Sequence, residues 1–248
     1  MEKIKDSHIL IIAAGASVKK YWTKIKQFIK ENNAITIGCN NINDILIPDY
    51  NMWGSSRRYR KYRKSINKSS IVVVPIGFKN RHPIFWRKNY KEYSTDERLP
   101  GTTTITHKTI YHYFKNITMT SILFAYSYGA SKISVAGMDG YTFYSEDELK
   151  TNKFSQHCYG EGFSDGQDYV YCKRKDIRTY NVLKDLYSYG KEKYGFYFEI
   201  ITPTIYTEYY NFKTLDIEEK YRGKDISLED KINFKIDKNK KFIENSKY

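Results

Sequence analysis

The feature that most constrains the fold is a set of short apolar runs separated by segments of helical length. The runs are HILIIAA from residue 8, AITIGC from 34, IVVVPIGF from 71, KISVAGM from 132 and FYFEIITP from 196, with a shorter YNMW from 50. Continuous apolar runs of this length indicate strands that are buried on both faces. Their alternation with helices is typical of parallel sheets. We therefore expect a single doubly wound, mostly parallel, Rossmann-like α/β sheet.

Three helices are predicted between these strands. Apolar residues recur at helical intervals from Val18 to Ile29, with lysines between them, which indicates an amphipathic helix. A second helix has a hydroxyl or Asn116 near its N-terminus as the cap and stops at Gly129. A third covers residues 176–195.

The remaining stretches set the expected organisation of the chain. Residues 79–112 have no clean period, so we expect an inserted loop region there. Residues 142–172 are polar, contain glycines and are rich in tyrosine, which predicts a lid. After Leu215 the chain becomes highly charged. We expect residues 1–215 to form the functional domain and residues 216–248 a basic carboxyl-terminal extension.

The charge balance indicates anionic partners. The chain has 42 lysines and arginines against 28 acidic residues, a net charge of +14. This charge attracts nucleic acid, anionic lipid or phosphorylated ligands without choosing among them. Cys39, Cys158 and Cys172 fit neither a disulfide framework nor a metal knuckle, so we expect a reducing compartment.

The apolar segments also bear on localisation. No run approaches the ~20 apolar residues that cross a bilayer, and the stretch MEKIKDSHILIIAAG lacks the apolar length of a signal peptide. We expect a cytoplasmic protein, with peripheral attachment to the inner face of the membrane as an open alternative.

The candidate site is the set of residues that follow the strands, because ligands of doubly wound sheets bind beyond the carboxyl ends of the strands. These residues are Ala14, Gly15, Ala16 and Ser17; Asn40 and Asn41; Trp53, Gly54, Ser55 and Ser56; and Asp139, Gly140 and Tyr141.

The first two of these loops each have two interpretations. Gly15 permits a tight turn, and the N–H groups after it can hold a phosphate at a helix start. Alternatively, Gly15 is only a turn and Ser17 only a helix cap. AAGAS is not the GxGxxG of dinucleotide folds, and the sequence has no P-loop. Asn40 and Asn41 can read a base or a ribose through paired donors and acceptors, or they can close an Asx-turn.

The last loop and the predicted lid supply further candidates. Asp139 can hold a metal, a ribose or the N–H groups of its own loop. Tyrosine hydroxyls, such as those of Tyr141 and Tyr144, can neutralise a departing phosphate. His157 is a candidate general base near neutral pH; the alternative is a solvated surface histidine.

Four segments resemble a known family. LIIAAGASVKK, ITIGCNN, YGASKISVAGMDGY, and KDIRTYNVLKDL with the later ITP are similar to glycosyltransferase family 42, the bacterial sialyltransferases that cap lipooligosaccharides. They resemble at similar strength the wider MptE-like superfamily, which includes pterin diphosphokinases and flagellar glycosylation factors. The resemblance covers roughly residues 8–205. Its sharpest element is a helix end, a strand and Gly-x-Asp-x-Tyr, from Gly129 to Tyr141.

The resemblance implies roles for the strand-end residues. The first loop of such an enzyme grips the CMP phosphate, which falls on Ala14, Gly15 and Ser17. The asparagine after the second strand contacts the cytidine side of the nucleotide sugar, which falls on Asn40 and Asn41.

Further roles follow for the other loops. The tyrosine of Gly-x-Asp-x-Tyr, here Tyr141, steadies the leaving phosphate. The Thr-Ser-Gly loop before the central helix falls on the segment from Asn116 to Thr118. The Asn-Pro-Ser after the third strand corresponds to the segment from Gly54 to Ser56.

The sequence departs from the family at important positions. The family's Asn and Gly-Pro-Ser of the first loop read Ala14 and then Gly-Ala-Ser here. The family's catalytic histidine falls on Tyr171, so the base is either His157 or Tyr171. Asp139 and Tyr144 complete the set of expected substrate-binding residues.

The most basic stretch is RRYRKYRK, from Arg57 to Lys64. Its charges go nearly all round a helix, so we expect a helix at the edge of the site that is poorly suited to core packing. We expect Arg57, Arg58, Arg60 and Lys61 to dock an anionic acceptor glycan or an anionic membrane leaflet. A solvated basic face is the structural alternative. Nucleic acid comes second, because no pattern of a nucleic-acid-binding module is present.

The activity that these features predict is an inverting, metal-independent transfer of sialic acid or a related 2-keto sugar from a CMP-sugar to a surface glycan or glycolipid. The CMP-sugar is a co-substrate, and we expect neither a cofactor nor a metal. One alternative is an MptE-like diphosphokinase that uses ATP and Mg²⁺. Another is a non-enzymatic, basic polyanion-binding or nucleic-acid-binding protein. A homo-oligomer is left open.

Overall fold

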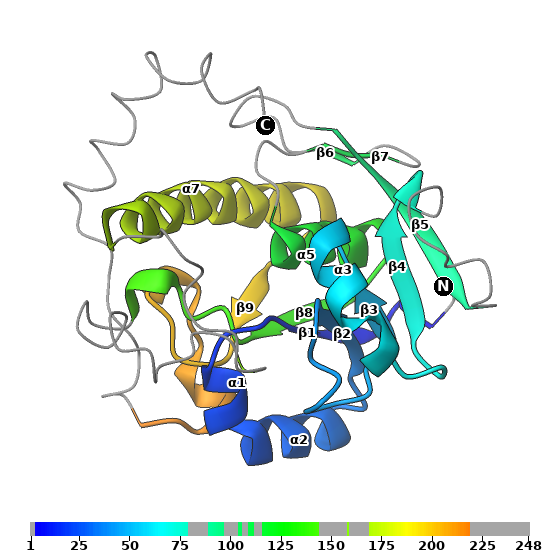
Figure 1. Cartoon of the computed structure of the whole chain (residues 1–248). Helices are drawn as coiled ribbons and strands as arrows, with labels where there is room; N and C mark the ends of the chain where they lie inside the picture. The colour runs from blue at the N-terminus through cyan, green and yellow to red at the C-terminus, as the bar shows by residue number, and fades with distance from the viewer. Residues whose placement is uncertain are drawn as a thin grey trace.

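A computed structural model describes residues 3–78, 89–96, 104–105, 109–111, 116–143, 158 and 169–218 (Figure 1). Within these ranges the chain forms a nine-stranded sheet with the order β6-β7-β5-β4-β3-β2-β1-β8-β9. The strands are β1 (His8–Ile12), β2 (Ile35–Cys39), β3 (Tyr50–Met52), β4 (Ile71–Pro75), β5 (Tyr90–Asp96), β6 (Thr104–Ile105), β7 (Thr109–Tyr111), β8 (Lys132–Ala136) and β9 (Phe198–Ile200). Only the β6–β7 pair is antiparallel, which confirms the predicted mostly parallel sheet.

Helices cover both faces of this sheet, so the fold is doubly wound. The α-helices are α1 (Ser17–Lys20), α2 (Trp22–Glu31), α3 (Ser56–Tyr62), α5 (Ile117–Ser127) and α7 (Tyr169–Tyr194). Short 3-10 helices are η1 (Arg63–Ser65), η2 (Tyr141–Phe143), η3 (Thr207–Tyr209) and η4 (Phe212–Leu215). Figure 1 shows α1 and α2 on one side of the sheet and α5 and α7 on the other.

The central strand shows why an unbroken apolar run is needed. Successive side chains of a strand point to opposite faces. Ile9 and Ile11 of β1 pack in the core beneath α5 and α7, whereas Leu10 and Ile12 pack in the core beside α2. All four are fully buried.

The order of the strands fixes the position of any ligand site. From β1 the chain runs outward through β2, β3, β4 and β5, and then returns through α5 to β8 and β9 on the other side of β1. β1 and β8 pair directly, from His8 with Lys132 to Ile12 with Ala136. The winding therefore reverses between β1 and β8, and crevices at such reversals are where doubly wound sheets bind ligands.

The expectation of a structureless insertion at residues 79–112 was wrong where the chain is described. β5 pairs in parallel with β4, from Val72 with Tyr90 to Pro75 with Tyr93. The strand sequence YKEYSTD has no apolar run, and tertiary pairing decides its structure rather than local pattern. Its anchor is Tyr93, which is buried and donates a hydrogen bond to the carbonyl of Trp53 at 3.2 Å.

Two helix boundaries also differ from the prediction. The helix expected from Val18 to Ile29 is two helices with a break at Tyr21. The third helix begins at Tyr169 rather than residue 176, so Tyr171 lies in α7 and not in a lid. Most of the predicted lid, including Tyr144 and His157, lies outside the described residues.

The packed body continues slightly beyond the predicted end of the domain. Leu215 and Ile217 are both buried in the core beside α2. The remaining carboxyl-terminal residues lie outside the described part of the chain. Each helix in the described part is either too short or too polar to cross a membrane. The three cysteines are buried, and none is in a disulfide.

Candidate functional site

Two loops meet at the reversal between β1 and β8. The Gly15 N–H donates to the carbonyl of Gly137 at 2.8 Å. A Cβ at Gly15 would lie 2.4 Å from that oxygen and 2.6 Å from Cγ of Asp139, closer than real Cβ atoms come. Gly15 is therefore required for the close approach of the two loops, whatever its relation to a ligand.

Ser17 and Asp139 join these loops. The Ser17 N–H donates to Oδ2 of Asp139 at 2.9 Å, and its hydroxyl donates to Oδ1. Both residues are buried. The carboxylate of Asp139 thus occupies donors that were expected to hold a phosphate. It accepts them from the loop after β1 rather than from its own loop, a contact that the sequence interpretation did not include.

The segment after β9 is hydrogen-bonded to the loop after β8, which contains Gly137, Met138 and Asp139. The Gly137 N–H donates to Oγ1 of Thr202 at 2.8 Å, and the Thr204 hydroxyl donates to the carbonyl of Met138 at 2.6 Å. The Ile205 N–H donates to the carbonyl of Asp139 at 3.0 Å. The loop is therefore held in one arrangement before any ligand arrives.

A buried carboxylate from α7 holds the next turn. Asp176 is only 1% exposed. It accepts the N–H groups of Tyr141 at 2.9 Å and Thr142 at 2.7 Å, the Thr142 hydroxyl at 2.8 Å and the Tyr206 hydroxyl at 3.0 Å. Burial raises the pKa of Asp176, although these hydrogen bonds oppose the shift. Asp176 therefore fixes η2, the turn that carries Tyr141.

Sequence reasoning missed Asp176, but it had a usable signal. Cys172, Thr179, Tyr180 and Leu183 lie four positions before it and three, four and seven after it, and all are buried. This spacing defines one face of a helix. A lone carboxylate on a buried helical face needs hydrogen-bond donors, so its position predicts a contact with polar groups of another segment.

Tyr141 is partly buried at the carboxyl end of β8. The ammonium of Lys175 lies 4.8 Å from the centroid of its ring, within the range of a cation–π contact. Of the other residues expected to act in catalysis, the side chain of Tyr171 and the whole of His157 lie outside the described residues.

The two asparagines after β2 behave differently. The side-chain oxygen of Asn41 accepts hydrogen bonds from the Asn43 side-chain amide at 3.3 Å and from the Ser65 hydroxyl at 3.1 Å, which are contacts within the protein but not the expected Asx-turn. Asn40 has a left-handed backbone with φ of 58°, and its N–H donates to the carbonyl of Met52. Asn40 is 5% exposed, and within the described ranges its side-chain amide has no hydrogen-bond partner. Of the two asparagines, Asn40 is therefore the one whose side-chain amide is not engaged by the described part of the protein.

The ends of β3 and the start of α5 lie beside each other. A Cβ at Gly54 would lie 3.4 Å from Cδ1 of Ile117. The Asn116 side chain accepts the Thr118 N–H at 2.9 Å and so caps α5, as predicted. Ser56 opens α3 at the same edge of the sheet.

One described residue of the predicted lid, Cys158, touches the first loop. The Cys158 N–H donates to the carbonyl of Ala14 at 2.8 Å. Burial raises the pKa of the Cys158 thiol to about 12, so it stays protonated near neutral pH. It is therefore a packing residue rather than a nucleophile.

The basic segment forms α3 and η1. The expectation that it is poorly suited to core packing was wrong for one face of the helix, the face that carries Tyr59. Tyr59 is 1% exposed and contacts the rings of Trp53 and Phe78, with centroids 5.6 and 5.3 Å away. Its cations lie around the remaining surface: Arg57, Arg60, Lys61 and Lys64 are exposed, and Arg58 is half-buried. A single tyrosine thus anchors a cationic helix.

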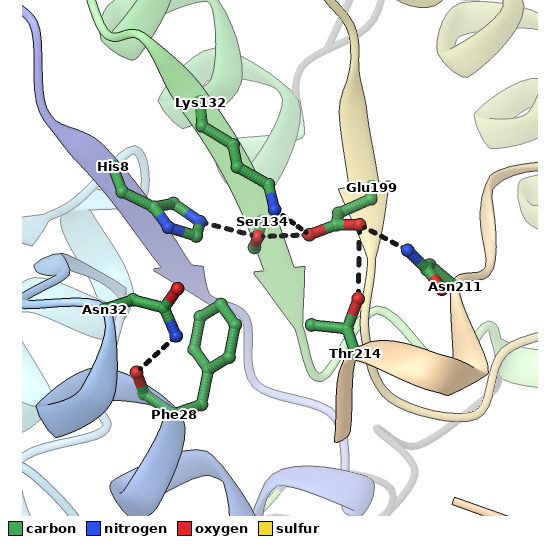
Figure 2. Close-up of polar contacts among 8 residues, drawn as sticks. All are labelled: His8, Phe28, Asn32, Lys132, Ser134, Glu199, Asn211 and Thr214. Atoms are coloured by element: carbon green, nitrogen blue, oxygen red, sulfur yellow. Dashed lines mark hydrogen bonds and ion pairs between the residues drawn. The ribbon is translucent and has the colours of Figure 1, made fainter. Parts of the chain in front are cut away.

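A second polar cluster lies across β1, β8 and β9 (Figure 2). The Ser134 hydroxyl lies 2.8 Å from Nε2 of His8 and donates to Oε1 of Glu199 at 2.8 Å. The serine therefore lies between histidine and carboxylate, whereas in a nucleophilic triad the histidine is central. Because Ser134 is fully buried, this cluster is not a nucleophilic site.

The described residues thus bring together only part of the expected set. Gly15, Ser17, Asp139 and Tyr141 lie at the β1–β8 reversal, and Asn40, Gly54 and Asn116 lie at neighbouring positions along the same edge. Among the described side chains, no group of three or more His, Cys, Asp or Glu residues is arranged to hold a metal ion. A scan against protein-family models and a search of curated proteins each found no match.

Proposed function

We propose that the chain is a glycosyltransferase that moves sialic acid or a related 2-keto sugar from CMP to a glycan acceptor. The observation that carries the proposal is the pairing of the AAGAS loop with the Gly-x-Asp-x-Tyr loop at the β1–β8 reversal. That is where a doubly wound sheet binds its ligand. It is also where the resemblance to family 42 places the nucleotide.

The proposed reaction breaks the bond between the anomeric carbon and the phosphate oxygen, and CMP leaves with the electron pair. The acceptor oxygen attacks from the opposite face, so the configuration inverts, and its proton passes to a base. His157 and Tyr171 remain the proposed alternatives for that base.

The described residues support parts of this scheme. The Asn40 amide is available to a base or ribose. Tyr141 and Lys175 offer a hydroxyl and an ammonium at the end of β8. Asp139 and Asp176 already accept hydrogen bonds from donors of the protein, so a leaving phosphate would be held by other donors nearby. The cations of α3 would dock the anionic acceptor or the membrane that carries it.

The test is the thermal stability of the whole chain with CMP, CDP, GTP, and ATP with and without Mg²⁺. A ligand that binds only the folded state raises the melting temperature. We expect selective stabilisation by the cytidine nucleotides. Selective stabilisation by ATP with Mg²⁺ would replace the proposal with a diphosphokinase. Stabilisation by none of them would favour a non-enzymatic polyanion-binding protein.

A further inference from the structure

A hollow lies at the opposite ends of the strands from the loops described above. It has a volume of about 530 Å³ and opens beside β9, the edge strand. Ser131 and Lys132 line it from the start of β8, and Gly195, Phe196 and Tyr197 line it from just before β9. It therefore lies at the amino ends of these strands, whereas the candidate nucleotide site lies at the carboxyl ends.

The hollow has a rigid aromatic wall. The rings of Tyr187 and Tyr197 are stacked, with centroids 4.4 Å apart and planes within 8°. Tyr187 also packs against Tyr209 and Phe198, at 5.2 and 5.8 Å. Tyr197 is 45% exposed, one of four large hydrophobic side chains exposed in the described part of the chain. An aromatic ring that is both exposed and fixed by stacking offers contact area at little entropic cost.

The hollow also has a polar part that centres on Glu199, whose contacts are drawn in Figure 2. Its carboxylate pairs with the Lys132 ammonium at 3.2 Å and accepts hydrogen bonds from Asn211 at 2.7 Å, Ser134 at 2.8 Å and Thr214 at 3.3 Å. Burial alone would raise the pKa of Glu199, but these hydrogen bonds and the charge of Lys132 together lower it. This polar part is therefore a fixed set of donors and acceptors.

The charge of the hollow differs from that of the whole chain. The charged lining residues are Lys132, Glu199 and Glu208, so the lining has a net charge of −1. The whole chain, in contrast, has a net charge of +14. Glu208 is exposed and accepts the Tyr180 hydroxyl at 2.6 Å. An anionic ligand would be repelled here. A cationic amine would gain little, because an exposed carboxylate contributes little to binding and Glu199 is already paired.

We propose that this hollow binds an uncharged saccharide. The C–H face of a pyranose ring would stack on the exposed face of Tyr197, since the negative face of the aromatic ring attracts C–H groups. The sugar hydroxyls would bond to Lys132, Asn211 and the remaining lone pairs of Glu199. The volume lies within the range of small-molecule sites lined by aromatic residues and a few polar groups. The inference stands independently of the proposed transferase activity.

The test is saturation-transfer NMR of the whole chain with lactose, maltotriose and chitotriose. We expect transfer to at least one of them. Tyr197→Ala should weaken that binding at least about tenfold, the effect of removing an anchoring tyrosine. Tyr62→Ala on α3 is the matched control, because it removes a partly exposed tyrosine far along the sheet.

Three outcomes would overturn the inference. The first is no transfer to any of the three sugars. The second is transfer that persists unchanged in Tyr197→Ala. The third is tighter binding of choline or of an anionic sugar such as sialyllactose at the same hollow. Lys132→Met, which removes a polar contact without touching the aromatic wall, gives a second variant if Tyr197→Ala fails to fold.

Discussion

Ser17 gives both its backbone N–H and its hydroxyl to the carboxylate of Asp139, across 122 positions of sequence. The contact ties the start of α1 to the loop after β8 at the point where the sheet reverses its winding. An anion from the protein itself therefore occupies donors at this helix start, and a bound phosphate would have to be held by neighbouring groups.

A double-mutant cycle tests whether these two residues act as a unit. Ser17→Ala and Asp139→Asn should each lower the free energy of unfolding by about 1–3 kcal/mol, because each leaves a buried polar group without its partner. The double variant should lose less than the sum of the two. Urea denaturation measures all four proteins. Losses that add within about 0.5 kcal/mol would show that the contact contributes little.

The raised pKa of Asp176 predicts a pH dependence. A carboxyl whose pKa is higher in the folded state stabilises that state fully below its ordinary pKa of 3.8. This contribution is lost as pH rises through the pKa of the folded state. The stability advantage of wild type over Asp176→Asn should therefore be larger near about pH 4 than near about pH 7. Tyr206→Phe is the control, because it removes one hydrogen-bond donor to Asp176 but keeps the carboxyl group itself. An advantage that grows with pH would contradict this account.

Tyr59 and Tyr62 test whether α3 is anchored by its buried tyrosine, because Tyr59 is buried and Tyr62 is partly exposed. Tyr59→Ala should cost about 3–5 kcal/mol of stability, as for other large aromatic residues removed from a core. Tyr62→Ala, at a partly exposed position three residues later, should cost less than about 1 kcal/mol. Denaturant midpoints measure both. Equal losses would mean that α3 is not anchored by Tyr59.

The cations of α3, of which three are exposed and Arg58 is half-buried, should bind anionic membranes. Replacing Arg57, Arg58, Arg60 and Lys61 with Gln should weaken binding to phosphatidylglycerol vesicles by up to about 1 kcal/mol per charge, and added salt should weaken it further. The matched control replaces four lysines elsewhere that are also exposed: Lys26, Lys30, Lys191 and Lys193. Sedimentation with vesicles measures both variants. Much tighter binding to nucleic acid, lost with the same four residues of α3, would show that the glycan or membrane interpretation is wrong.

The sequence predicted those parts of the fold that local pattern decides. Unbroken apolar runs located β1, β2, β4 and β8, and Asn116 and Gly129 marked the ends of α5 correctly, the latter with a φ of +76°. β5 was missed because its residues are polar and its structure comes from pairing with β4. A strand of that kind has no signature in local sequence.

The candidate site was less predictable, because its contacts join distant residues. The loops themselves were predicted correctly, because ligands of doubly wound sheets bind beyond the carboxyl ends of the strands and these loops follow those ends. The sequence did not indicate that Gly15 has its closest neighbours in Gly137 and Asp139, so a valine there would disrupt the loops as well as any ligand. Asp176 was overlooked because it was treated as one more charge on a polar helix, although its neighbours at helical spacing are buried.

The central claim is tested most directly by the release of CMP from CMP-sialic acid, CMP-Kdo and a CMP-nonulosonate by the whole chain in the presence of a glycan acceptor. We expect release from at least one donor, and a decrease of roughly 10²–10⁴-fold in His157→Ala, the usual effect of losing a general base. Tyr171→Phe should cost less, because an ordinary tyrosine pKa near ~10 suits it poorly to that role at neutral pH. Near-normal release of CMP by His157→Ala would mean that another residue is the general base. No release from any of the three donors by the folded protein would contradict the claim that this chain transfers sugars from CMP.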